Sequence, residues 1–146
     1  MLRRLSLLAA LVWASFVAFI VFASFGDTSL LHIGAHVVQL PLIGAATVLA
    51  WWVRPEAVKR AQKVMLWIIS VTTPLAFLGI AGELVTAVVR FGEDGWENKD
   101  TADIWVDGPH AIIANITVPA LFLSMLTVLV LLLTIAVQER RRPSVA

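Results

Sequence analysis

Four long apolar stretches dominate the hydrophobic pattern, and the polar residues gather between them. The stretches run over 5–25, 31–53, 64–89 and 111–137. A helix needs about 20 apolar residues to cross the hydrocarbon core of a bilayer, and a helix satisfies its own backbone hydrogen bonds there. The connections 26–30 and 54–63 are short, so consecutive helices should be antiparallel neighbours. The pattern predicts an all-α integral membrane protein, one transmembrane domain over 1–146, folded as an up-down-up-down four-helix bundle.

Composition supports this class. The chain is 60% hydrophobic and 14% charged, whereas about half of an ordinary soluble domain is apolar. The lack of cysteine excludes disulfides, thiolate metal sites and cysteine nucleophiles. No segment combines basic and aromatic residues as nucleic-acid binding would require. Arg3 and Arg4 precede the first apolar run as in a secretion signal, but that run has no small-residue cleavage site, so we expect a retained anchor.

The distribution of charge predicts the orientation. Basic residues gather at the N-terminus, in the connection 54–63 and at residues 140–142, whereas the connection 92–109 is acidic. By the positive-inside rule, both termini should lie in the cytoplasm and the acidic connection outside, in a bacterial-type cytoplasmic membrane. Trp96 and Trp105 would anchor that connection at the outer interface.

A faint internal repeat relates the two halves. His32 begins the stretch HIGAHVVQLP, which ends at Pro41, and His110 begins HAIIANITVP, which ends at Pro119. Each follows an apolar segment that ends in Phe-Gly and an acid. The repeat indicates two duplicated helix pairs, each with a histidine where its second helix begins. Duplicated helices bring like groups together near a pseudo-symmetry axis, where binding sites often lie.

Glu83 is the carboxylate placed within a span. An ionisable group at such a depth is costly and points to function. Arg90 lies two turns away on the same helix face, but an interfacial arginine extends towards water. We therefore expect Glu83 to be protonated, or paired with a histidine of another helix, rather than bridged to Arg90.

The histidines offer two cofactor chemistries. His32 and His36 lie on one helix face and suit two ligands of one divalent metal, with His110 as the third. The oxygen ligands would come from Asp27, Glu83, Glu93 or Asp107.

Alternatively, His32 or His36 and His110 are the axial ligands of a haem b, with Arg90 on a propionate. Both place the cofactor in the outer half, with Glu83 and Arg90 beside it. A third interpretation has the histidines only capping helices and bonding to the acidic connection.

In broad outline the architecture resembles small bacterial b-type cytochromes, in helix count and in the histidines His32, His36 and His110 on alternate helices. The resemblance implies haem binding and electron transfer. Cytochromes of the two-haem type use four helical histidines, and this chain has three, which leaves a single haem.

Three classes of function follow. The first is a cofactor-binding electron-transfer protein, with a haem or a metal, within a membrane complex. The second is an accessory subunit without cofactor, associated with other membrane subunits or with its own copies. The third is a small proton or cation transporter that uses Glu83. No HExxH, phosphate-binding loop or GxSxG motif occurs, so we expect no independent catalytic activity.

The predicted topology can be tested by single-cysteine labelling, since the chain has no native cysteine to interfere. Cysteines replacing Glu56 and Ser144 should react only with reagent on the cytoplasmic side. Cysteines replacing Ser29 and Lys99 should react from outside. Labelling of positions 99 and 144 from the same side would contradict the topology.

Overall fold

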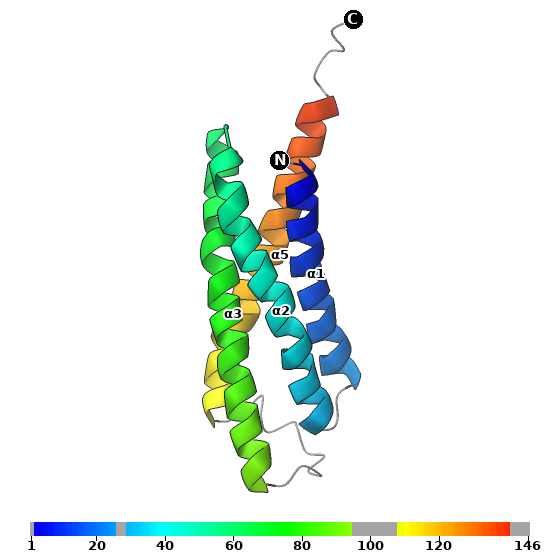
Figure 1. Ribbon diagram of the computed structural model, residues 1–146, viewed down its shortest axis with the longest axis vertical. Coiled ribbons are helices and arrows are strands. Elements are labelled where there is room, and N and C mark those ends of the chain that lie inside the picture. The colour runs from blue at the N-terminus through cyan, green and yellow to red at the C-terminus, as the bar shows by residue number, and fades with distance from the viewer. Residues whose placement is uncertain (1, 26–28, 95–107, 141–146) are drawn as a thin grey trace, which may run out of the picture.

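The protein is a bundle of four long helices, as the hydrophobic pattern predicts (Figure 1). The computed structural model describes residues 2–25, 29–94 and 108–140. The elements are α1 (Leu2–Phe25), α2 (Ser29–Val53), the short 3-10 helix η1 (Arg54–Glu56), α3 (Arg60–Asp94) and α5 (Gly108–Arg140). All four α-helices are long and apolar enough to cross a membrane.

The helices form a closed ring that runs up and down. Contacts link α1 with α2, α2 with α3, α3 with α5 and α5 with α1. The N-terminal end of α1 and the C-terminal end of α5 lie at the same end of the bundle (Figure 1). The predicted spans fall within the four helices, which extend past them; α3 continues to Asp94 and α5 begins at Gly108. The central part of the acidic connection, with Trp96 and Trp105, lies outside the described residues.

Apolar residues cover both the inside and the outside of the bundle. Leu5, Leu66 and Leu131 are completely buried, whereas Leu30 and Leu78 are each 66% exposed. A lipid-facing surface has no reason to be polar, so hydrophobicity alone does not separate the interior from the exterior. The interior is distinguished instead by its small and polar residues.

Small residues let α3 approach its neighbours closely. A Cβ added at Gly79 would lie 2.9 Å from Thr117 Cβ on α5, and one at Gly82 would lie 3.2 Å from Ile113. On the other flank, a Cβ at Gly44 of α2 would lie 3.2 Å from the Phe77 ring of α3. Small residues at helix interfaces are the usual means of close packing in membranes, where no hydrophobic force drives helices together.

Hydrogen bonds between side chains and neighbouring helices add polar links inside the bundle. Ser124 on α5 donates to Thr72 Oγ1 on α3 at 2.6 Å. Gln39 on α2 donates to the Ser15 carbonyl of α1 at 3.2 Å. Each of these hydrogen bonds gives a partner to a polar group that would otherwise have none in the apolar interior. Bonds of this kind contribute about 0.6 kcal/mol on average to the stability of membrane proteins.

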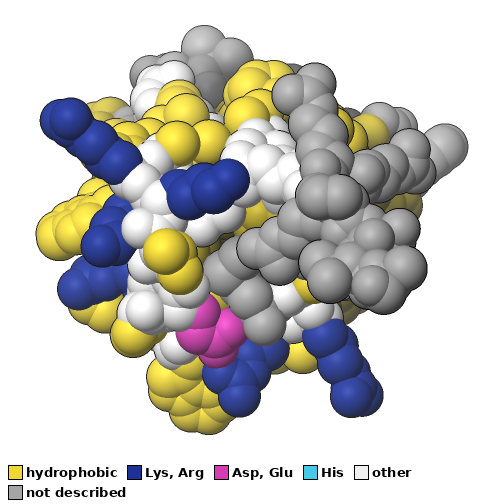
Figure 2. All heavy atoms as spheres, turned by 90° about the horizontal axis from the view of Figure 1, so that it is seen from above, with side chains coloured by type: hydrophobic (Ala, Val, Ile, Leu, Met, Phe, Trp, Pro, Cys, Tyr) yellow, Lys and Arg dark blue, Asp and Glu magenta, His cyan; other side chains and the backbone are white. Residues whose placement is uncertain are grey.

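The end that carries both termini is basic. Figure 2 looks onto this end, and Lys and Arg side chains project around its rim. An ion pair between Arg4 and Glu56 joins α1 to η1 there. The basic end is the one that the positive-inside rule assigns to the cytoplasm, and that assignment stays a prediction.

The α3–α5 contact should be sensitive to a single methyl group at Gly79. In Gly79→Ala the new Cβ would collide with Thr117, a β-branched side chain with little freedom to rotate. We expect the variant to lose about 1–3 kcal/mol of stability, measured by thermal unfolding in mild detergent. Gly34→Ala is the control, because a Cβ at Gly34 meets nothing within 4 Å. Equal unfolding temperatures for the two variants would contradict the close approach.

Candidate metal centre

Three helices bring the polar groups of the interior together at one point. His32 and His36 come from the first turns of α2, His110 from the first turn of α5, and Glu83 from the second half of α3. Their exposed fractions are 6%, 3%, 2% and 2%, in that order. All four lie towards the end of the bundle opposite the termini. We call His32, His36, His110 and Glu83 the His/Glu cluster.

The three imidazoles meet through the same ring atom. His32 Nε2 lies 3.0 Å from His110 Nε2 and 3.0 Å from His36 Nε2. The donor atoms of the three histidines all lie within 4.8 Å of one another. His32 and His36 are one turn apart on α2, and α5 faces α2 across the bundle, so His110 meets them from the opposite side.

Hydrogen bonding among the imidazoles cannot satisfy this arrangement. A neutral imidazole Nε2 carries either one N–H or one lone pair. If His32 Nε2 donates its proton to one neighbour, it has no lone pair left for the other. If it accepts from one neighbour, its single lone pair is used. One of the two 3.0 Å contacts therefore lacks a proper hydrogen bond, whereas a cation between the three atoms would use all three lone pairs.

Glu83 completes the cluster from α3. Its Oε2 lies 3.8 Å from His110 Nε2 and 4.0 Å from His36 Nε2. Glu83 Oε1 and His36 Nδ1 are buried and have no hydrogen-bond partner among the described residues. A carboxylate oxygen left unsatisfied in an apolar interior is strongly unfavourable. The expected contact of Glu83 with histidines of other helices is confirmed, and in its ionised form this carboxylate would need a positive charge beside it.

The spacing of the four donor atoms is close to that of a tetrahedral ion. Metal–imidazole distances of about 2.0–2.1 Å imply that ligand atoms lie about 3.3 Å apart in a tetrahedron. The histidine pairs at 3.0 Å are slightly closer than that, and the Glu83 contacts at 3.8 and 4.0 Å slightly farther. The ligand atoms of the remaining histidine pair, His36 and His110, lie within 4.8 Å of each other, so these two side chains would have to approach by up to about 1.5 Å to hold one tetrahedral ion.

An apolar cover closes the cluster on the side away from the termini. The Phe91 ring stands edge-on to the His32 imidazole, with 6.2 Å between ring centroids. Phe91 and Ala87 are buried, and Ile33 packs against them. The cover was not predicted from the sequence. It could have been, because Glu83, Ala87 and Phe91 follow one another at four-residue intervals and so share one face of α3.

The other candidates lie outside this cluster. Arg90 is half-buried on α3, seven residues from Glu83 and therefore about 10 Å along the helix. Glu93 is exposed near the end of α3. Asp27 and Asp107, the further oxygen ligands that the sequence offers, are not among the described residues. The structure thus brings together four of the candidate ligands, the three histidines and Glu83.

Comparison of the chain with known protein families, with characterised proteins and with solved structures finds no match. The function is therefore inferred from the cluster itself.

The burial of the cluster can be measured with diethyl pyrocarbonate, which modifies histidine. The chain contains three histidines, all in the cluster, so the reagent reports on this site without background. We expect slow modification of the native protein and much faster modification of Phe91→Ala, which removes the cover. Phe122→Ala is the control, since Phe122 contacts Phe16 away from the cluster, at a centroid distance of 6.0 Å. Equal rates in the two variants would contradict the covering role of Phe91.

Proposed function

We propose that this protein is a membrane-embedded metal-binding protein that holds one first-row transition-metal ion in the His/Glu cluster. The ligands would be Nε2 of His32, His36 and His110 and the carboxylate of Glu83. The observation that carries the proposal is the convergence of three imidazole Nε2 atoms that cannot satisfy one another by hydrogen bonds. Imidazole ligands suit zinc, copper, iron and nickel.

The charge balance favours an ion as well. The anionic form of Glu83 lacks a compensating cation among the described residues within its 4.0 Å contacts. A divalent ion at the centre of the cluster would neutralise the carboxylate and give its oxygens a partner. Burial away from water is unfavourable for an isolated carboxylate. It would strengthen the attraction between the carboxylate and a bound ion, because the surroundings have a low dielectric constant.

The spacing favours a single ion over a haem. Two axial histidines lie on opposite faces of a porphyrin, with the iron between them, so their Nε2 atoms should be about 4 Å apart. The Nε2 atoms of His32 and His110 are 3.0 Å apart. The third imidazole, that of His36, has its Nε2 atom 3.0 Å from His32 Nε2. A porphyrin would have to push these three rings apart. One ion requires only small movements.

Four protein ligands would leave no open coordination position. Catalytic metal sites keep such a position for water or substrate, whereas closed sites serve structural or electron-transfer roles. The cover of Phe91 over His32 supports the same conclusion. We therefore propose a non-catalytic role, in which the bound ion joins α2, α3 and α5 and, if it is redox-active, carries an electron as part of a membrane electron-transfer complex.

Metal analysis tests the proposal. The protein, purified through a tag without histidine, should contain about one transition-metal ion per chain by mass spectrometry of the elements. Reconstitution with cobalt(II) should give visible bands of a tetrahedral ion. Loading at a hundred times the dissociation constant should stabilise the fold by about 2.7 kcal/mol, seen as a rise in the unfolding temperature.

The ligands can be assigned by substitution. His36→Ala, His110→Ala and Glu83→Gln should each abolish stoichiometric binding, because each removes one of four ligands. Gln62→Leu is a control, since Gln62 is buried at the opposite end, 3.4 Å from Gln138. Full occupancy in His110→Ala would refute the site. A protein that stays metal-free after exposure to cobalt, zinc, copper and iron would refute the function, and a Soret band in the purified protein would establish the haem instead.

A further inference from the structure

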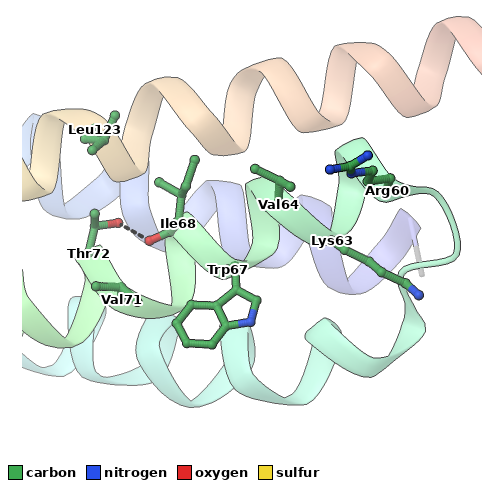
Figure 3. A pocket seen from close by; sticks show the side chains of 8 residues that line it. All are labelled: Arg60, Lys63, Val64, Trp67, Ile68, Val71, Thr72 and Leu123. Carbon is green, nitrogen blue, oxygen red and sulfur yellow. Dashed lines mark hydrogen bonds between the residues drawn. The ribbon is translucent and has the colours of Figure 1, made fainter.

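A groove runs along the outside of the bundle on the flank of α3, at the end that carries the termini. Its volume is about 510 Å³. Figure 3 shows Arg60 and Lys63 at one end of the groove and Val71 and Leu123 at the other. The groove is lined by Arg60, Lys63, Val64, Trp67, Ile68, Val71, Thr72 and Leu123. All but Leu123 belong to α3, and they recur at the three- and four-residue spacing of one helix face.

The length of the groove matches one leaflet of a bilayer. From Arg60 to Val71 the helix advances by about 16 Å, and half of the hydrocarbon core is about 15 Å thick. Arg60 and Lys63 come directly before the apolar run that starts at Val64, so the basic end of the groove should lie at the depth of the headgroups. Its apolar end, at Val71 and Leu123, then lies near the middle of the bilayer.

Arg60 and Lys63, at the basic end of the groove, form no ion pair with a carboxylate among the described residues. Both side chains are exposed. Glu56, an acid at this end, pairs with Arg4 instead. Arg60 and Lys63 are therefore available to an anion that binds from outside.

Arg54 adds a third cation at the rim. Its guanidinium lies 4.6 Å from the centre of the Trp51 ring and 5.0 Å from that of Trp67. This stacking holds the Trp67 indole at the edge of the groove. Arg54 Nη1 is buried and has no hydrogen-bond partner among the described residues.

We propose that this groove is a binding site for one anionic phospholipid. The phosphate would lie between Arg60 and Lys63, and one acyl chain would extend along Val64, Ile68 and Val71 to Leu123. The two cations at one end of the otherwise apolar groove suit an anionic headgroup with an acyl chain better than they suit the uniformly apolar face of a partner's transmembrane helix. The proposal does not depend on the metal centre, because the two sites lie at opposite ends of the bundle.

Native mass spectrometry of the full chain in mild detergent tests the site. After delipidation, phosphatidylglycerol should rebind as a single adduct, whereas phosphatidylcholine, with the same acyl chains and no net charge, should bind much more weakly. Near-surface cations each contribute about a fivefold gain in affinity for anionic lipid. Arg60→Gln combined with Lys63→Gln should therefore weaken phosphatidylglycerol binding about 25-fold.

A matched control separates the groove from the general positive charge of this end. Arg3→Gln combined with Lys59→Gln removes the same charge from exposed positions that do not line the groove, and should leave the single adduct in place. For the acyl chain, Ile68→Trp should block the groove and displace the lipid, whereas Val85→Trp, an exposed position on α3 outside the groove, should not.

Three outcomes of the binding measurements would overturn the proposal, and one outcome of a competition experiment is a fourth. The three are equal binding of the two phospholipids, equal losses in the two charge-removal variants, and unchanged binding in Ile68→Trp. Inorganic phosphate or glycerol 3-phosphate competing as well as the whole lipid would also overturn it, because the acyl chain would then contribute nothing. Unfolding temperatures of all variants check that a loss of binding does not reflect a loss of fold.

Discussion

A polar side chain inside a membrane has no water to bond with, and this constraint organises the interior of the bundle. Buried hydroxyls and amides turn to backbone carbonyls or to each other, as Ser124 does with Thr72 and Gln39 with the Ser15 carbonyl. In the His/Glu cluster such pairing is incomplete for several ionisable groups at once. Three imidazoles and a carboxylate meet there with too few protons and lone pairs in the right places. The cation that we propose for this site would remove that mismatch by accepting all of these lone pairs.

Much of this structure follows from the sequence for simple physical reasons. Helix number and alternation follow from the length of the apolar stretches. The histidines His32, His36 and His110 lie in the first turns of α2 and α5, at the same end of the bundle, and this much follows from the predicted spans. Glu83 lies eleven residues before the end of α3, so its meeting with the histidines depends on how far α3 extends past its neighbours. The pairing of Glu83 with histidines, in preference to Arg90, follows from the tendency of interfacial arginine to extend towards water.

Other features depend on the rotation and spacing of the helices, which hydropathy does not report when lipid surrounds the bundle. That Thr117 faces Gly79 is a matter of helix rotation. So is the position of Phe91 over His32, although the four-residue spacing from Glu83 carries a signal. The stacking of Arg54 between Trp51 and Trp67 arises because η1 turns the chain back towards α3. The sequence predicts that the basic residues lie on one side of the membrane. It does not predict the groove that runs from Arg60 and Lys63 to Leu123.

The cluster divides the bundle into two unequal halves. Towards the termini the core consists of large aliphatic side chains, among them Leu5, Leu8, Leu66 and Leu131, all completely buried. The half with the cluster contains ionisable groups instead, under the apolar cover of Phe91. Moving one elementary charge through 100 mV changes its energy by about 2.3 kcal/mol. In an energised membrane, a charge that reached the cluster would therefore gain or lose energy in proportion to the share of the voltage that it had crossed.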